Sequence, residues 1–183
     1  RRGMTVVLAD WDGDALAALA KELGDQAHAY ATDVRDPAAL EALAEAAFTH
    51  HGGVDLLFNN AGVLTTGLSW EISADAWQRS LDINIGGVVN GLRAFVPRMT
   101  ATGRPARIIN TASAHSLVAS PYKAAYVTAK HGVAGLNKTV ALELATFGIT
   151  SNCISPGYVW TPLVERQIPE TMAARGLTRE QVI

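Results

Sequence analysis

The sequence has a single cysteine, almost no excess of either charge and no long apolar run. Among its 183 residues, 15 Lys and Arg stand against 17 Asp and Glu, so it offers no basic face for nucleic acid and no polybasic patch for a membrane. No uninterrupted apolar stretch approaches the roughly 20 residues that cross a bilayer. Cys153 cannot form an internal disulfide, which favours a reducing setting. We therefore expect a cytoplasmic protein that acts on a small molecule.

Short apolar runs alternate with longer helical patterns along the whole chain. The patterns predict strands at 5–10, 27–34, 54–62, 106–113 and 149–157, and helices at 14–24, 36–52, 74–99 and around Tyr126. Asp36 as a cap, Pro37 in a first turn, and Gly24 and Gly52 as stops mark helix ends. Strands separated by helices imply βαβ crossovers. We predict an α/β fold, a doubly wound parallel sheet covered on both faces, in one domain over 1–183.

The phosphate-binding loop of nucleotide-binding α/β proteins is missing. No two glycines are separated by a single residue, so the motif G-x-G-x-x-G cannot occur. The opening RRGM reads as the tail of a helix, and the closing TREQVI reads as the start of another. We therefore expect an excerpt of a longer protein, a partial Rossmann-like domain that lacks its first strand and its glycine-rich loop.

The segment SAHSLVASPYKAAYVTAKHG, residues 113–132, has a residue spacing that suits proton transfer. Tyr126 and Lys130 are four apart in a helical pattern, so the ammonium can approach the phenol. A nearby positive charge favours the phenolate and eases proton exchange with a substrate hydroxyl. Ser113, at the end of a predicted strand, can hold the reacting oxygen. The three residues favour interconversion of an alcohol and a carbonyl, although Tyr-x-x-x-Lys alone also occurs as an ordinary surface pair.

The motifs NNAG at 59–62, Ser113, YVTAK at 126–130 and SPG at 155–157 together resemble the short-chain dehydrogenase/reductase family, over essentially the whole chain. The resemblance implies hydride transfer between a nicotinamide cofactor and an alcohol or carbonyl. It implies that Tyr126 is the acid and base, that Lys130 tunes the phenol and binds the ribose, and that Ser113 orients the reacting oxygen. Asn84, in LDINIGG, would support a water-linked proton relay behind the lysine; the alternative is an ordinary polar residue in a helix.

Two aspartates and a set of small residues are expected to bind the cofactor. Asp10 ends a predicted strand, where a carboxylate can bind the adenosine ribose and repel a 2′-phosphate, which favours NAD over NADP. Its alternative is a helix cap. The resemblance implies that Asp33 contacts the adenine. It also implies a cofactor groove lined by Asn59, Ala61, Gly62, Pro156, Gly157, Val159 and Thr161. A tight turn at Pro-Gly and a helix cap at Thr161 are the alternatives.

His115 and Lys123 flank the reacting groups and are not general residues of the family. A pocket with one fixed positive charge and one titratable donor suits a carboxylate. Residues 113–132, followed by SPGYVWTPLVERQIP, resemble most the D-3-hydroxybutyrate dehydrogenase branch. That resemblance implies that His115, Lys123 and Gln167 hold a substrate carboxylate, with Tyr158 as an aromatic wall. The alternatives are a solvated lysine, a histidine bonded to backbone and an exposed glutamine.

The chain departs from that branch directly after NNAG. The branch usually has a glutamine there, whereas Val63 and Leu64 supply no hydrogen-bonding side chain. The expected function is an oxidoreductase that transfers a hydride between NAD(H) and a secondary alcohol or ketone, with a small 3-hydroxy acid such as D-3-hydroxybutyrate as substrate. The alternatives are another secondary alcohol or ketone, or a non-catalytic dinucleotide-binding scaffold.

Three further expectations concern the lid, the assembly and metals. Residues from about 158 to 183 would form a substrate lid. The helix at 74–99 and the helix that carries Tyr126 have more apolar surface than one sheet face needs, which indicates packing against copies of the chain. The resemblance implies that these copies form a homodimer or homotetramer. The histidines lack ligand spacing and partnered carboxylates, so we expect no catalytic metal.

Overall fold

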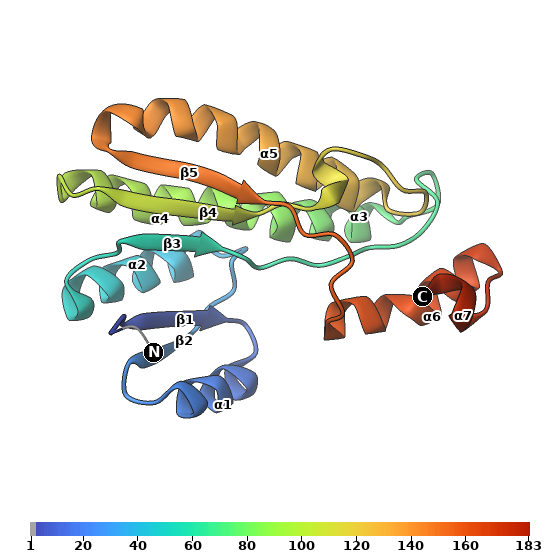
Figure 1. Ribbon diagram of the computed structural model, residues 1–183, viewed down its shortest axis with the longest axis horizontal. Helices are drawn as coiled ribbons and strands as arrows, with labels where there is room; N and C mark the ends of the chain where they lie inside the picture. The colour runs from blue at the N-terminus through green and yellow to red at the C-terminus, as the bar shows by residue number, and fades with distance from the viewer. Residues whose placement is uncertain (1–2) are drawn as a thin grey trace.

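The computed structural model in Figure 1 describes residues 3–183. Its strands are β1 (Val6–Asp10), β2 (Ala27–Ala31), β3 (Leu56–Asn59), β4 (Ala106–Thr111) and β5 (Ile149–Ile154). Its helices are α1 (Gly13–Leu23), α2 (Pro37–His51), α3 (Ala74–Leu81), α4 (Gly87–Ala101), α5 (Ala124–Leu144), α6 (Pro162–Arg175) and α7 (Arg179–Val182), with short turns η1 (Asp82–Gly86), η2 (Ala114–Ser116) and η3 (Ala145–Phe147). The alternation of strands and helices confirms the predicted α/β fold.

The helix ends follow the signals in the sequence. The Asp36 carboxylate accepts a hydrogen bond from the Ala38 amide at 2.8 Å, which caps α2. Gly24 and Gly52 end α1 and α2 with φ of 82° and 77°, which only glycine adopts at little cost. The closing TREQVI forms the short helix α7, as predicted. The predicted helix tail at RRGM covers residues 1–4; residues 1–2 lie outside the described residues, and Gly3 and Met4 are not helical.

The strands pair in parallel but form two sheets instead of the single sheet that the sequence predicted. β1 pairs with β2, and β3, β4 and β5 pair in that order. Figure 1 shows β1 and β3 running alongside each other, and no ladder joins them. The reason is that no strand of residues 3–183 lies between them to carry the hydrogen bonds across. The expectation of a fold without its first strand agrees with this division.

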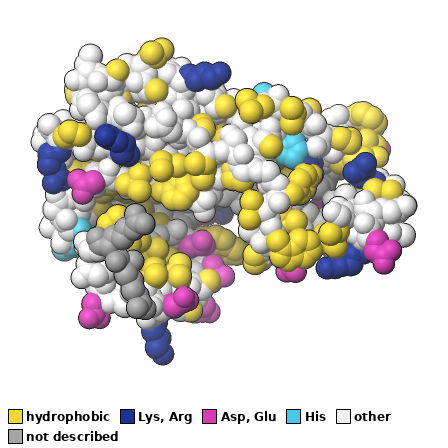
Figure 2. Space-filling model, in the orientation of Figure 1, with side chains coloured by type: hydrophobic (Ala, Val, Ile, Leu, Met, Phe, Trp, Pro, Cys, Tyr) yellow, Lys and Arg dark blue, Asp and Glu magenta, His cyan; other side chains and the backbone are white. Residues whose placement is uncertain are grey.

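Only one face of the β3–β4–β5 sheet is covered, so the prediction of cover on both faces is wrong for the described residues. Leu57, Ile108 and Ile149 are buried in a core that they share with α2, α4 and α5. Leu56 and Phe58 alternate with Leu57 along β3 and are 50% and 48% exposed. Figure 2 shows hydrophobic side chains gathered over β3 on the open face. No described helix packs there, because α1 packs against β1 and β2.

Two histidines from separate elements stack where α2 ends beside β2. The rings of His28 and His51 have centroids 4.3 Å apart, and the Tyr30 hydroxyl is 3.5 Å from His51 Nε2. Burial, followed by the charges of His28 and His50, lowers the pKa of His51 below its ordinary value of 6.5. The sequence did not reveal this pairing, because the residues are far apart in the chain.

We expect the protein to lose stability as the pH falls below about 6.5, partly through His51. Above that pH the ring is neutral in both states. Below it the unfolded chain takes up a proton that the folded chain takes up only at lower pH, so protonation favours unfolding. Urea titrations at about pH 7.5 and 5.5 should show a smaller loss in His51→Gln than in the parent chain. His131→Gln, at an exposed position on α5, is the control. Equal losses in all three chains would contradict the prediction.

Candidate active site

The candidate site lies at the edge where the parallel strands end. Asp10 ends β1, NNAG follows β3 from its last residue, Ser113 follows β4, and SPG follows β5. Because carboxyl ends of parallel strands meet at one edge, segments far apart in the sequence come together there. A hydrogen bond from the Ala114 amide to the Pro156 carbonyl, at 2.9 Å, joins the loop after β4 to the SPG segment.

Ser113 is held rigidly at the start of η2. Its side chain is buried and accepts a hydrogen bond from the His115 amide at 3.1 Å. Its carbonyl accepts a bond from the Ser116 hydroxyl at 2.6 Å. These contacts fix both the backbone and the hydroxyl oxygen of Ser113. A residue that orients a substrate oxygen needs such a fixed position.

Tyr126 and Lys130 lie one helical turn apart on α5, as predicted. Lys130 is only 3% exposed, and its ammonium donates to the Thr111 carbonyl at 2.7 Å and lies 5.6 Å from the centre of the Tyr126 ring. Burial lowers the pKa of Lys130 to about 8. Burial also raises the pKa of Tyr126, and a hydrogen bond with Ser113 offsets part of that rise. Tuning of the phenol by Lys130 stays a prediction.

Asn84 is fully buried at the turn η1, where the predicted helix at 74–99 is interrupted. The turn has the wider π spacing, so the single predicted helix becomes α3, η1 and α4. The Asn84 amide donates to the carbonyls of Val63 and Ser80, both at 2.8 Å, and its oxygen accepts from the Val63 amide at 3.2 Å. The side chain therefore ties the helix to the segment after NNAG.

Gly62 brings that segment close to the buried lysine. A Cβ at Gly62 would lie 3.0 Å from the Asn84 oxygen and 3.5 Å from Lys130 Nζ. A side chain at this position would crowd both groups. The sequence predicts that Gly62 lines the cofactor groove and that Asn84 belongs to the catalytic residues. In the structure, Gly62 lies close to both Asn84 and Lys130.

A ladder of amides that runs through the buried side chain of Asn110 supports the site and was missed from the sequence. Asn59 donates to the Asn110 oxygen at 2.9 Å, Asn110 donates to Asn137 at 3.0 Å, and Ser151 donates to Asn137 at 2.7 Å. The Asn59 oxygen also lies where a Cβ on Gly91 would be, at 2.5 Å. The Asn59 side chain therefore contacts Asn110 and the backbone of α4 at Gly91, and its predicted place in the cofactor groove stays a prediction.

The predicted substrate residues come together beside Tyr126. The Lys123 ammonium donates to the Tyr158 hydroxyl at 3.0 Å and to the Gln167 oxygen at 3.4 Å, and lies 5.1 Å from the Tyr158 ring centre. The His115 ring stands edge-on to the rings of Tyr126 and Tyr158, with centroids 6.1 and 6.4 Å away. Lys123 is 7% exposed, which excludes the alternative of a solvated lysine.

The backbone just before α5 fixes the position of Lys123. Tyr122 has a φ of 64°, an unusual value for a residue with a side chain. Its carbonyl accepts a hydrogen bond from the Gly67 amide at 2.9 Å, and Gly67 forms a short parallel bridge with Lys123. Lys123 itself stands at the N-cap of α5, where no side chain caps the helix. The helix therefore begins with a lysine and uncapped amide groups.

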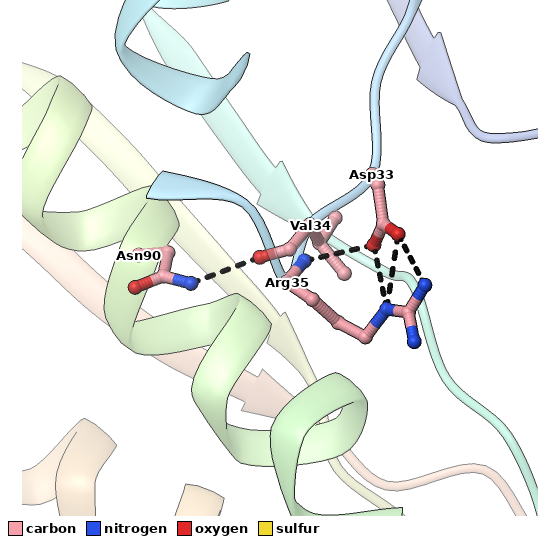
Figure 3. Close-up of polar contacts among 4 residues, drawn as sticks. All are labelled: Asp33, Val34, Arg35 and Asn90. Carbon is pink, nitrogen blue, oxygen red and sulfur yellow. Dashed lines mark hydrogen bonds and ion pairs between the residues drawn. The ribbon is translucent and has the colours of Figure 1, made fainter. Parts of the chain in front are cut away.

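The two aspartates expected at the adenosine end have different local partners. Asp10 accepts from the Asp12 amide at 3.0 Å, and Asp12 caps α1, so the alternative of Asp10 as the helix cap is wrong. Figure 3 shows Asp33 bound by Arg35 through the backbone amide and the guanidinium, the shortest contact being 2.6 Å. The Arg35 side-chain hydrogen bond lowers the pKa of Asp33. Both cofactor assignments stay predictions.

The remaining predicted cofactor residues follow the strand ends and make no direct hydrogen bond to the side chains of Ser113, Tyr126 or Lys130. Ala61, Gly157 and Val159 are exposed and Pro156 is half-buried. Thr161 caps α6 by accepting from the Val164 amide at 3.4 Å, as its alternative role required. Within residues 3–183, no three His, Cys, Asp or Glu side chains cluster in a way that could hold a metal ion. None of the described helices is long and apolar enough to span a membrane.

Comparison with known proteins gives consistent matches. A family described as short chain dehydrogenase matches residues 1–171. The D-beta-hydroxybutyrate dehydrogenase of Rhizobium meliloti (strain 1021) is 52% identical over 132 residues, which cover 72% of this chain and 51% of that protein. The D-beta-hydroxybutyrate dehydrogenase of Cupriavidus necator is 38% identical over 152 residues, 83% of this chain and 58% of that protein.

Solved structures match the fold closely. Actinorhodin polyketide ketoreductase with NADPH is 32% identical with a TM-score of 0.93, over 98% of this chain and 70% of that chain. This match supports the Rossmann-like fold. The chain spans about half the length of the curated relatives it matches.

Proposed function

The chain belongs to the short-chain dehydrogenase/reductase family, and we propose that it is an NAD-dependent oxidoreductase that interconverts a secondary alcohol and a ketone. The proposed substrate is a small 3-hydroxy acid such as D-3-hydroxybutyrate. One observation carries the choice of an acid: Lys123 is buried, its ammonium contacts Tyr158 and Gln167, and none of the ion pairs among residues 3–183 includes it.

A carboxylate is the ligand that the surroundings of Lys123 favour. A buried ammonium without a negative partner is costly, and Tyr158 and Gln167 offer it only neutral oxygens. The uncapped N-terminus of α5 adds amide dipoles that also favour an anion. Relatives named D-beta-hydroxybutyrate dehydrogenase support the same choice. Leu64, which follows NNAG and Val63, has no hydrogen-bonding side chain, so it would not contribute a bond to the substrate carboxylate.

The chain's own residues provide the acid and base chemistry. In the oxidation, the Tyr126 phenolate takes the proton of the substrate hydroxyl, and in the reduction the phenol returns it to the carbonyl oxygen. The Ser113 hydroxyl donates a hydrogen bond to the same oxygen. The positive charge of Lys130, one turn from the phenol, favours the phenolate. A bound nicotinamide supplies hydride transfer to or from the substrate carbon.

The residues present fit a nicotinamide dinucleotide at its two ends. Gly62 leaves room beside Lys130, which would bind a ribose together with Tyr126. Asp10 would bind the adenosine ribose, and Asp33 would contact the adenine. A carboxylate at Asp10 disfavours a 2′-phosphate, which is the basis for proposing NAD, although a related ketoreductase is described with NADPH.

The proposed reaction is tested by NADH formation from D-3-hydroxybutyrate, followed by its absorbance. A panel of other hydroxy acids, neutral secondary alcohols and NADP separates the alternatives. Turnover of neutral alcohols without turnover of any hydroxy acid would refute the carboxylate site. No turnover of any substrate would favour the non-catalytic scaffold.

Lys123→Ala should raise KM for the acid about tenfold to a hundredfold and leave kcat and neutral alcohols little changed, because the loss of a charge-assisted bond costs about 1.5–3 kcal/mol. Lys138→Ala, at an exposed position on the same helix, is the matched control. Steady-state kinetics on the acid and on a neutral alcohol give the comparison. Equal effects on both substrates would assign Lys123 a structural role.

The lid, the assembly and the compartment are part of the same proposal. In Figure 1, α6 and α7 stand apart from the sheets, and Gln167 of α6 reaches Lys123, which suits a lid over 158–183.

A shallow groove between α4 and α5, lined by Leu92, Val96 and Val140, would pack against a second copy in a homodimer or homotetramer. The free thiol of Cys153 fits a reducing cytoplasm.

A further inference from the structure

Among the described residues, two side-chain hydrogen bonds join helix α6 to the rest of the chain. One runs from the Lys123 ammonium to the Gln167 oxygen at 3.4 Å. The other runs from the Thr66 hydroxyl to the Glu170 carboxylate at 2.5 Å. Ile168, on the same turn of α6, is buried, whereas Figure 1 shows α6 and α7 standing apart from the sheets. The turn from Gln167 to Glu170 is therefore the part of α6 that is attached to the site.

The backbones of Thr66 and Lys123 belong to one fixed unit. Gly67, which follows Thr66, donates its amide hydrogen to the Tyr122 carbonyl at 2.9 Å and forms the parallel bridge with Lys123. Gly67 has a φ of 148°, and a Cβ there would lie 3.0 Å from Ile72 Cγ1. A residue with a side chain would disturb this close approach. The Thr66 hydroxyl therefore has a defined place relative to Lys123.

The two bonds attach one face of α6 to this unit at two points. Gln167 and Glu170 are three residues apart in the helix, so their side chains lie on the same face. The direction of each bond follows from the groups, because an ammonium only donates and a carboxylate only accepts. The Thr66 hydroxyl is therefore the donor to Glu170. A helix held at one point can pivot, and the second bond restricts that motion.

We propose that Thr66 and Glu170 are positioning residues that hold α6 against the candidate acid site and keep Gln167 at the Lys123 ammonium. The inference rests on the proposed function, in which Lys123 binds the substrate carboxylate. Glu170 is exposed, so its bond to Thr66 has moderate strength and can open for substrate entry and product release. The Glu170 carboxylate contacts Thr66 and takes part in none of the ion pairs among residues 3–183, which leaves Lys123 to an acid ligand.

The first test is the steady-state kinetics of Thr66→Val, which removes the hydroxyl and keeps the shape of the side chain. We expect KM for D-3-hydroxybutyrate to rise about threefold to tenfold, because α6 is in place for a smaller fraction of the time. The kcat should change little, since Ser113 and Tyr126 are untouched, and KM for a neutral secondary alcohol should stay within about twofold. Thr66→Ser should restore KM, and Thr65→Val, at the neighbouring threonine, is the matched control. An equal rise in KM for both substrates would overturn the inference.

Double variants separate a bond between the two residues from independent effects of each. Glu170→Ala should raise KM for the acid as much as Thr66→Val does, and the double variant should raise it no further. In a Gln167→Ala background, Thr66→Val should also have no further effect on KM, since the amide that the bond positions is gone. Effects that multiply in either pair would show that Thr66 and Glu170 do not act through Gln167.

A second measurement does not depend on catalysis. Arg166 is exposed on α6 next to Gln167, so trypsin can cut after it only when this part of the helix detaches and opens. In the whole chain, cleavage after Arg166, followed by mass spectrometry, should be about threefold to tenfold faster in Thr66→Val and Glu170→Ala than in the parent and in Thr65→Val. Equal rates in all four chains would overturn the inference. If no alcohol or ketone is turned over, the proposed function fails, and these rates still decide whether Thr66 and Glu170 hold α6.

Discussion

Replacing Tyr126 with phenylalanine should lower kcat about a thousandfold, because positioned acid and base groups contribute roughly 10²- to 10⁴-fold to rates. The change removes only the phenolic oxygen. The ring that stands edge-on to His115 remains, so the packing of α5 against η2 is kept. Without the phenol, the substrate hydroxyl loses its proposed acid and base group. Steady-state kinetics with D-3-hydroxybutyrate and NAD measure the effect.

Binding of the dinucleotide should largely survive the same change, since Lys130 and Gly62 keep their positions and only the proposed ribose contact of Tyr126 is lost. A fluorescence titration with NADH should give a Kd for Tyr126→Phe within about tenfold of the parent value, the effect of one lost hydrogen bond. Tyr30→Phe, in β2, is the matched control and should retain kcat. More than about a tenth of the parent kcat in Tyr126→Phe would remove Tyr126 from the role of acid and base, given the contribution expected of such a group.

Local patterns in the sequence predicted the elements well, because their causes are local. The Asp36 cap, the glycine stops and the strand predicted at 106–113, which is observed at Ala106–Thr111, depend on residues that are neighbours in the chain. The division into two sheets and the open face at Leu56 and Phe58 depend on which elements pack together. Such contacts join distant segments. A local pattern therefore carries no direct sign of them.

The interruption of the helix at 74–99 was invisible for a related reason. Asn84 in a helical pattern is compatible with an ordinary surface position, and only its contacts with Val63 show why the turn widens. The candidate catalytic pair could be proposed from the sequence because Tyr126 and Lys130 share one helix face. The amide ladder through Asn59, Asn110 and Asn137 was missed, because its members come from β3, β4 and α5.

Asn84→Ala should lower the free energy of unfolding by about 3 kcal/mol, because buried polar groups that lose a partner cost about 1–3 kcal/mol each. The amide and carbonyl of Val63 and the carbonyl of Ser80 would all lose bonds to the Asn84 side chain. The π turn would also lose the side chain that fixes it against the NNAG segment. Urea unfolding followed by circular dichroism measures the change.

Asn152→Ala is the matched control, because Asn152 is exposed on β5 and should cost less than about 0.5 kcal/mol. Asn84→Asp separates shape from hydrogen bonding, since a carboxylate can still accept from the Val63 amide but cannot donate to the two carbonyls. We expect it to be about as unstable as Asn84→Ala. A loss equal to that of Asn152→Ala would mean that the helix, and not the Asn84 amide, holds Gly62 beside Lys130.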